Sequence, residues 1–144
     1  LPRVRGDARE FQQVIFNLIT NAVAAMTAKE GGGRKLTVKA RADSQWVHVS
    51  VTDSGIGIPK RIKPQIFDPF FTTKKVGEGT GLGLSLCYGI VSKYGGKINF
   101  SSISAEDYPE RPTGTTFVVS MPLFQAADSA KKETLHDPEH PLRG

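Results

Sequence analysis

Cysteine is nearly absent from this 144-residue chain, and so are long apolar runs. The single cysteine, Cys87, excludes a disulfide framework and a cluster of thiolate metal ligands, and it fits a reducing, cytoplasmic setting. No run approaches the roughly 18 apolar residues of a membrane span. The sequence begins at Leu1, with neither an initiator Met nor a signal-like segment. We therefore expect a soluble cytoplasmic domain cut from a longer chain.

The composition, with 38% hydrophobic and 23% charged residues, predicts one globular core. The formal charge of +5 suits nucleic acid, phosphate ligands or an acidic partner, but the cations are scattered rather than striped. We expect one domain over residues 1–124 and a polar, disordered tail over 125–144. His136 and His140 in that tail are four apart, but Pro138 disfavours a helix that would join them in a metal site.

The most informative stretch runs from Gly77 to Leu86 and has glycine at alternate positions before an apolar helical run that begins near Leu82. Bare backbone at a helix start offers unpaired N–H groups to phosphate oxygens. The spacing fits neither a Walker loop nor the dinucleotide fingerprint, so a different phosphate-binding fold is required. For this stretch alone, a flexible loop ending in a helix cap is the alternative.

A helix with one buried face is predicted to begin at a capping box formed by Asp7 and Glu10 and to end before Gly31. Its expected buried residues are Phe11, Val14, Ile15, Leu18, Ile19, Ala22, Val23 and Met26.

Along one edge of that helix, Gln13, Asn17 and Asn21 stand four residues apart. A carboxamide oxygen suits Mg²⁺, which shares its shell between water and phosphates. For these amides alone, hydrogen-bonded polar residues at the edge of the core are the favoured explanation.

Alternating polar and apolar residues over 35–42 and 46–52, joined by a short connection, predict an antiparallel hairpin. The apolar residues of both strands should face the core, and His48 should be solvated. Two more strands are expected over 97–104 and 115–121. Before them lies a second helix that ends at Gly95, with Leu82, Leu86, Cys87, Ile90, Val91 and Tyr94 on its buried face.

Asp53 ends the second predicted strand and is followed by Gly55, Gly57 and the apolar Ile58. An ionised carboxylate only accepts hydrogen bonds, so it would take the amino group of adenine and refuse guanine. A turn in which the aspartate bonds local backbone is the alternative.

Between this turn and the glycine-rich stretch, Phe67 to Phe71 group three aromatics around a proline. We interpret them as the apolar anchor of a mobile lid. Lys74 or Lys75 would then reach a phosphate, unless both are merely solvated.

Taken in order, these segments resemble the ATP-binding catalytic domain of sensor histidine kinases, in the superfamily of DNA gyrase, the large heat-shock chaperone and the mismatch-repair ATPases. The likeness covers residues 4 to 123. Several ordered boxes match together: the asparagine box at 17–22, the glycine boxes at 53–57 and 79–84, the phenylalanine box at 67–71 and the last box at 114–117.

The resemblance implies an α+β fold, a two-layer α/β sandwich with a mixed, largely antiparallel sheet (the Bergerat ATP-binding fold). It implies that Asn21 and Asn17 hold Mg²⁺, that Asp53 takes the adenine amino group, and that Thr115 supports the aspartate through water. The residues expected to contact ATP are Asn17, Asn21, Asp53, Gly55, Gly57, Ile58, Phe67, Lys74, Thr80, Gly81, Leu82, Gly83, Leu84 and Thr115.

One position favours a kinase over a hydrolase. Hydrolysing relatives carry a glutamate four residues before the metal-binding asparagine, where this chain has Asn17, and an amide cannot act as that base. A histidine acceptor needs no base there, because neutral imidazole is itself a nucleophile. Ala24 stands where many members carry a basic residue, so Lys74, Lys75 or the acceptor domain would neutralise phosphate charge.

The resemblance thus implies a Mg-ATP-binding catalytic domain of a two-component sensor histidine kinase, which donates the γ-phosphate to a histidine on a helical dimerisation domain absent from this chain. No self-contained catalytic residue is expected. Expected partners are that phosphoacceptor domain and a response regulator receiver domain, with no nucleic acid. The isolated domain should be a monomer and the intact kinase a homodimer, cytoplasmic or anchored to a membrane. The alternatives are a self-contained ATPase of the same fold and a nucleotide-dependent interaction module.

Overall fold

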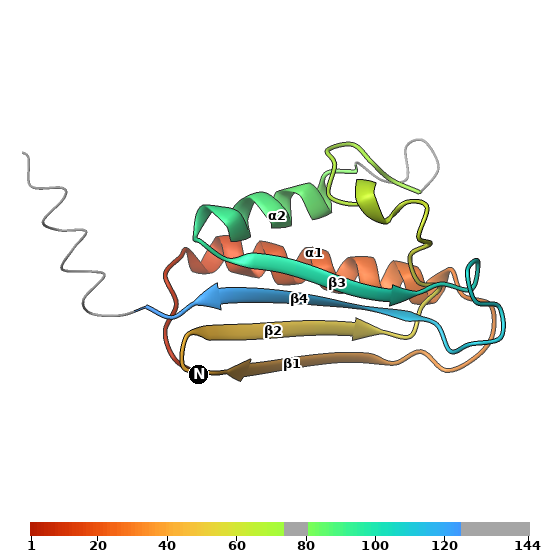
Figure 1. The fold of residues 1–144 in the computed structure, drawn as a ribbon, viewed down its shortest axis with the longest axis horizontal. Coiled ribbons are helices and arrows are strands. Elements are labelled where there is room, and N and C mark those ends of the chain that lie inside the picture. Colours follow the sequence, from red (N-terminus) through yellow and green to blue (C-terminus); the bar gives the residue numbers. More distant parts are fainter. Residues whose placement is uncertain (74–80, 125–144) are drawn as a thin grey trace, which may run out of the picture.

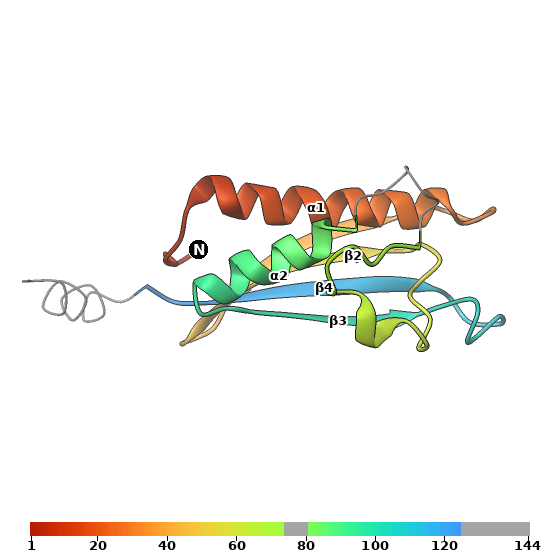
Figure 2. The same cartoon turned by 90° about the horizontal axis from the view of Figure 1, so that it is seen from above.

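Two helices pack on one face of a four-stranded sheet in the computed structural model, which describes residues 1–73 and 81–124 (Figures 1 and 2). The sheet order is β1-β2-β4-β3, and the three strand pairings are all antiparallel. The predicted two-layer sandwich with a largely antiparallel sheet is confirmed. The elements are α1 (Ala8–Thr27), β1 (Leu36–Ala42), β2 (Trp46–Asp53), the short 3-10 helix η1 (Lys63–Gln65), α2 (Gly83–Lys93), β3 (Lys97–Ile103) and β4 (Gly114–Pro122).

The N-terminal helix α1 begins as predicted, because the Asp7 side chain accepts a hydrogen bond from the Arg9 N–H at 2.7 Å. Glu10 does not complete a capping box. Its carboxylate accepts hydrogen bonds from Lys93 and Tyr94 instead, and so ties the start of α1 to the end of α2. In the described residues, no helix has the length and apolar character required to cross a bilayer.

The buried side chains of α1 are Val14, Leu18, Ala22 and Met26, a narrower stripe than predicted. Val23 is 48% exposed, because it lies on the side of α1 that faces away from the sheet and α2. Phe11, Ile15 and Ile19 are half-buried beside the stripe.

The second helix, α2, buries Cys87, Ile90 and Val91, whereas Leu82 and Leu86 are exposed, contrary to the prediction. Apolar residues occupy more than one side of this helix, so spacing alone left its orientation open. Packing decides it: α2 lies against α1 and β3, and the Cys87 thiol donates to the Val14 carbonyl.

The edge strand β1 is exposed on both faces, although its apolar residues were predicted to face the core. Leu36 and Val38 remain 38% and 48% exposed. The reason is the breadth of the helical layer: α1 packs on β2 and α2 on β3, while β1 forms the lower edge of the sheet, beyond both helices (Figure 1).

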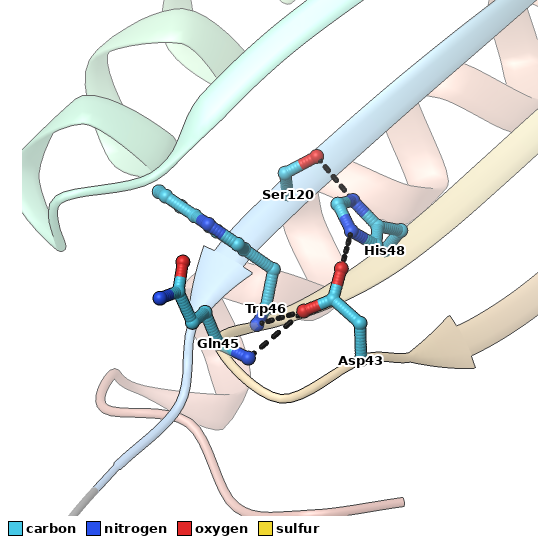
Figure 3. A network of polar contacts seen from close by, with 5 residues as sticks. All are labelled: Asp43, Gln45, Trp46, His48 and Ser120. Atoms are coloured by element: carbon cyan, nitrogen blue, oxygen red, sulfur yellow. Dashed lines mark hydrogen bonds and ion pairs between the residues drawn. The ribbon is translucent and has the colours of Figure 1, made fainter.

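A polar network closes the β1–β2 hairpin and joins it to β4 (Figure 3). Asp43 Oδ1 accepts from the Gln45 and Trp46 N–H groups at 2.8 Å, and Oδ2 lies 3.0 Å from His48 Nε2. His48 Nδ1 lies 2.7 Å from the Ser120 hydroxyl. His48 is therefore a half-buried bridge between strands rather than the solvated residue predicted, because Ser120 lies directly opposite it on β4.

Candidate functional site

One side of α1 contacts both predicted glycine-rich segments, the turn at 53–57 and the segment at 79–84. Asn17, Asn21 and Ala25 are four residues apart on the same side of the helix and span about 12 Å along its axis. At one end the Asn17 side-chain N–H donates to the Gly83 carbonyl at 3.3 Å, and at the other the Ile56 N–H donates to the Ala25 carbonyl at 3.1 Å. The half-buried Asn21 lies between them, so one side of α1 contacts both the turn after β2 and the start of α2.

Asp53 lies at the end of β2 on the side of the sheet that the helices cover, and it is only 6% exposed. Its Oδ1 accepts from the Gly55 N–H at 2.8 Å. Burial raises the pKa of this carboxyl, an effect that hydrogen bonds from the Gly55 and Thr115 backbone oppose. Two carboxylate oxygens offer about four acceptor positions, so capacity for a further donor remains.

Thr115 is paired directly with Asp53 across β2 and β4. Its hydroxyl lies 2.7 Å from that of Ser102, which also accepts from the Ile58 N–H at 2.7 Å. Ser102 thus connects Thr115 to the turn after β2. Sequence reasoning missed Ser102, because a lone serine in a strand carries no signal until the register of β3 against β4 is known.

Glycine is required at two positions of the turn after β2. A Cβ on Gly55 would lie 2.6 Å from the backbone of Ala25, and one on Gly57 would lie 2.1 Å from the Ile103 carbonyl oxygen. Gly57 also has φ of +76°, which side-chain-bearing residues rarely adopt. The turn is therefore clamped between the end of α1 and the end of β3.

The glycine-rich segment at 79–84 contacts the phenylalanine segment at 67–71 through the backbone. The Phe70 N–H donates to the Gly81 carbonyl at 2.9 Å, and a Cβ on Gly81, whose φ is +69°, would lie 2.3 Å from the Phe70 backbone. Helix α2 follows, and its N-cap residue Leu82 provides no side-chain hydrogen bond. Leu84 is half-buried against the core. The predicted contacts Lys74 and Thr80, together with Lys75 and the lid itself, lie outside the described residues.

Phe67 anchors its segment in an aromatic cluster. Its ring centroid lies 5.5 Å from that of Tyr88, 5.9 Å from Phe100 and 6.4 Å from Phe117. Of the three aromatics predicted to form the anchor, Phe71 is half-buried and Phe70 is 73% exposed. Phe67 and Phe71, which both pack against the core, therefore anchor the segment, and Phe70 does not.

The site offers carboxamides rather than carboxylates as metal ligands. In residues 1–73 and 81–124 there is no cluster of three or more His, Cys, Asp or Glu side chains fit to hold an ion. Within the same residues, the Asn21 carboxamide makes no hydrogen bond. Neutral oxygen ligands of this kind fit Mg²⁺ when phosphate oxygens and water complete its shell.

Known proteins match this chain over most of its length. Residues 6–125 match the family described as "Histidine kinase-, DNA gyrase B-, and HSP90-like ATPase". Sensor kinase CckA of Brucella abortus is 40% identical over 132 residues, which cover 83% of this chain and 13% of the relative. Sporulation kinase A of Bacillus subtilis is 39% identical over 119 residues, which cover 83% and 18%. The chain therefore spans less than a fifth of either relative.

The fold is also that of a solved kinase domain. The nucleotide-free catalytic domain of histidine kinase ThkA matches with a TM-score of 0.66 and 37% identity, over 84% of this chain and 72% of that one. Family match, fold and motif order agree. The chain belongs to the family of histidine kinase-, DNA gyrase B- and HSP90-like ATPases.

Proposed function

We propose that this chain is the Mg-ATP-binding catalytic domain of a two-component sensor histidine kinase and donates the γ-phosphate of ATP to a histidine on a helical dimerisation domain. The observation that carries the proposal is the α1 stripe from Asn17 to Ala25, which leads from the buried Asp53 turn to the glycine-rich start of α2. An extended nucleotide has the matching order of groups, with a flat base at one end and phosphates at the other. The kinase names of the relatives support the same assignment.

In this proposal Asp53 selects the base. The buried carboxylate accepts a hydrogen bond from the amino group of adenine, whereas guanine would present a carbonyl oxygen there and repel it. Thr115 supports Asp53 from β4, and Ser102 fixes both Thr115 and the Ile58 backbone. Gly55 and Gly57 let the turn pack closely against Ala25 and Ile103, which holds the Asp53 turn in place.

The phosphates then lie at the start of α2, where Gly83 and Leu84 offer backbone N–H groups at a helix end that has no side-chain cap from the described residues. Gly81 and Leu82 are proposed to contact the phosphates as well. Asn21 and Asn17 hold Mg²⁺ through their carboxamide oxygens, and the ion, when bound, neutralises phosphate charge. Lys74 and Thr80 are proposed to contact the phosphates as well.

The residue at position 17 is an asparagine, and this favours phosphate transfer to a histidine over hydrolysis of ATP. An amide cannot take a proton from water, while a neutral imidazole attacks phosphorus without a base. The protein then binds and orients the γ-phosphate. We assign this role to residues 1–124, and the proposed partners are the helical phosphoacceptor domain, a homodimer partner and a receiver domain.

Nucleotide selectivity tests the site. Titration calorimetry should show ATP bound more tightly than GTP, and chelating Mg²⁺ should weaken ATP binding. In the Asn21→Ala variant the affinity should depend less on Mg²⁺, with adenine recognition retained. Equal affinity for ATP and GTP would refute the Asp53 assignment, and binding insensitive to chelator would refute the metal site.

Phosphate transfer tests the reaction. The chain incubated with γ-labelled ATP should acquire no acid-labile label, whereas addition of a matching helical acceptor domain should label its histidine. Steady ATP turnover by the chain alone, abolished by Asn17→Ala, would instead indicate a self-contained ATPase. ATP binding without labelling of a matched acceptor would indicate a nucleotide-dependent interaction module.

A further inference from the structure

The outer edge of β1 has no strand beside it in the part of the chain that the structure describes. Within residues 1–73 and 81–124, β2 is the only strand paired with β1. The Ser54 N–H donates to the Lys35 carbonyl and the Asp43 N–H to the Trp46 carbonyl, so the odd-numbered residues from Lys35 to Asp43 form the hydrogen-bonded pairs with β2. The N–H and C=O groups of Leu36, Val38, Ala40 and Ala42 therefore point away from the sheet.

One face of this edge is positively charged. Lys39 and Arg41 lie opposite Ser50 and His48 and line a shallow depression of about 510 Å³ with them. Neither cation has an ion pair or side-chain hydrogen bond within the described residues. Residues 34–42 contain four cations and no acid.

The other face of the edge is apolar and uncovered. The exposed side chains on this face are those of Leu36, Val38, Ala40 and Ala42. They are exposed because α1 packs on β2 and α2 on β3, so that neither helix covers β1 (Figure 1). Exposed apolar side chains beside an open strand edge invite an added strand.

We propose that β1 docks an extended segment of a partner protein in which acidic and apolar residues alternate, so that the segment forms a fifth strand of the sheet. Successive side chains of a strand point to opposite faces, so the acidic ones would meet Lys39 and Arg41 while the apolar ones cover Leu36 and Val38. Its backbone would pair with the outward groups of β1, which is the common mode of strand addition.

Charge argues against the other occupants. If two copies of this chain paired through β1 in antiparallel fashion, the cations of both copies would meet on the same face, and like charges across strands are destabilising. Edge lysines are a usual defence against such self-pairing. A polyanion such as a nucleic acid would satisfy Lys39 and Arg41 but leave the apolar side chains and the strand backbone without partners.

The test uses an acetylated peptide as long as β1 in which Glu and Val alternate. We expect one-to-one binding by fluorescence anisotropy and, by NMR, new exchange protection of the amides of Leu36, Val38, Ala40 and Ala42. The amides of Thr37, Lys39 and Arg41 are already paired with β2 and should not change. Peptides in which Lys replaces Glu, or in which the same residues form two blocks, should bind at least about fivefold more weakly.

Variants separate the backbone and charge contributions. Ala40→Pro removes one outward N–H without touching the β2 pairing and should weaken peptide binding by about fivefold. Lys39→Glu combined with Arg41→Glu should transfer the preference to the Lys-Val peptide. Lys97→Glu reverses a single charge on β3 at the opposite edge of the sheet; it is the control for the single variant Lys39→Glu and should leave binding unchanged, whereas Lys39→Glu should weaken binding of the Glu-Val peptide. Thermal unfolding checks that each variant folds.

Three outcomes would overturn the proposal. The first is no binding and no new protection at the four amides. The second is concentration-dependent protection of those amides without peptide, which would identify a second copy as the occupant. The third is equal binding of the alternating and block peptides, which would reduce the edge to a nonspecific cationic surface.

Discussion

At the scale of single residues, burial of the charged Asp53 carboxylate lowers the stability of the fold. Its proposed role in binding adenine nevertheless requires the carboxylate to be ionised. Its pKa is raised by burial above the ordinary 3.8. Between 3.8 and the raised pKa the folded chain holds more protons than the unfolded chain, so the free energy of unfolding falls as pH rises through that interval.

Asp53→Asn should therefore separate stability from binding. At neutral pH the neutral amide removes the cost of a buried charge, so the midpoint of thermal unfolding should not fall. Loss of a hydrogen bond to a charged group costs about 1.5 to 3 kcal/mol, so ATP affinity should fall by about ten- to a hundredfold. Calorimetric titration and thermal unfolding measure the two effects, and unchanged affinity in the folded variant would contradict the adenine assignment.

Asp43 shows the opposite shift. Hydrogen bonds from the Gln45 backbone, from His48 and from the Trp46 backbone lower its pKa to about 2. Because the folded pKa lies below the ordinary 3.8, the stabilisation is present above pH 3.8 and is lost as pH falls toward 2.

Asp43→Ala should thus be less stable than the wild type at pH 7, and the difference should shrink between pH 4 and pH 2 as the wild-type carboxylate becomes protonated. Urea unfolding at a series of pH values measures this directly. A difference that stays constant across that interval would show that the carboxylate charge contributes nothing to the hairpin network of Figure 3.

At the scale of elements, the turn after β2 holds the site by close backbone contact. Gly57→Ala would place a methyl group against the Ile103 carbonyl at a positive φ and should cost about 1 to 3 kcal/mol of unfolding free energy. Gly33→Ala is the matched control, because nothing lies within 4 Å of its Cβ position and its φ is not positive. Chemical denaturation of both variants measures the difference, and equal stability would refute the clamp.

The segment from Phe67 to Phe71 should depend on Phe67 more than on Phe70. Phe67→Ala removes a half-buried ring from contact with Tyr88, Phe100 and Phe117 and should cost about 3 kcal/mol. Phe70→Gly should be neutral or stabilising, because Phe70 is exposed and has φ of +67°. Denaturant unfolding that ranks the two variants in the reverse order would overturn the assignment of Phe67 as an anchor.

At the scale of the whole molecule, the sheet separates two polar centres. The hairpin network lies at the Trp46 end of β2 and Asp53 lies at the other end, about 23 Å away along the strand. The stability changes of Asp43→Ala and Asp53→Asn should therefore add to within about 0.5 kcal/mol in the double variant. Asp43→Ala alone should leave ATP affinity unchanged, as calorimetry would show, and coupling between the two sites would contradict this separation.

Much of the molecule was predictable from local pattern. The cap at Asp7, the stripe of α1 and the short connection at 43–45 are local signals, and the elements they predict are present. The prediction was wrong where a residue's surroundings come from distant segments: Val38 and Leu86 are apolar at regular spacing yet exposed, and His48 is polar yet half-buried. Periodicity shows that a strand or helix has an apolar face but not whether another element covers it.

The sequence by itself determined the elements, their order, the sheet's antiparallel hairpin and the family, because these follow from short-range periodicity and from motifs that keep their order along the chain. Only the tertiary structure decided that Ala25 and Gly83 anchor the two glycine turns to one helix and that Ser102 joins Thr115 to the site. It also decided that β1 is an edge strand, paired with β2 alone among the described residues. Those facts depend on the breadth of the helical layer and on the register of β3 with β4. Both are set by long-range packing, in which contacts between distant residues are chosen together.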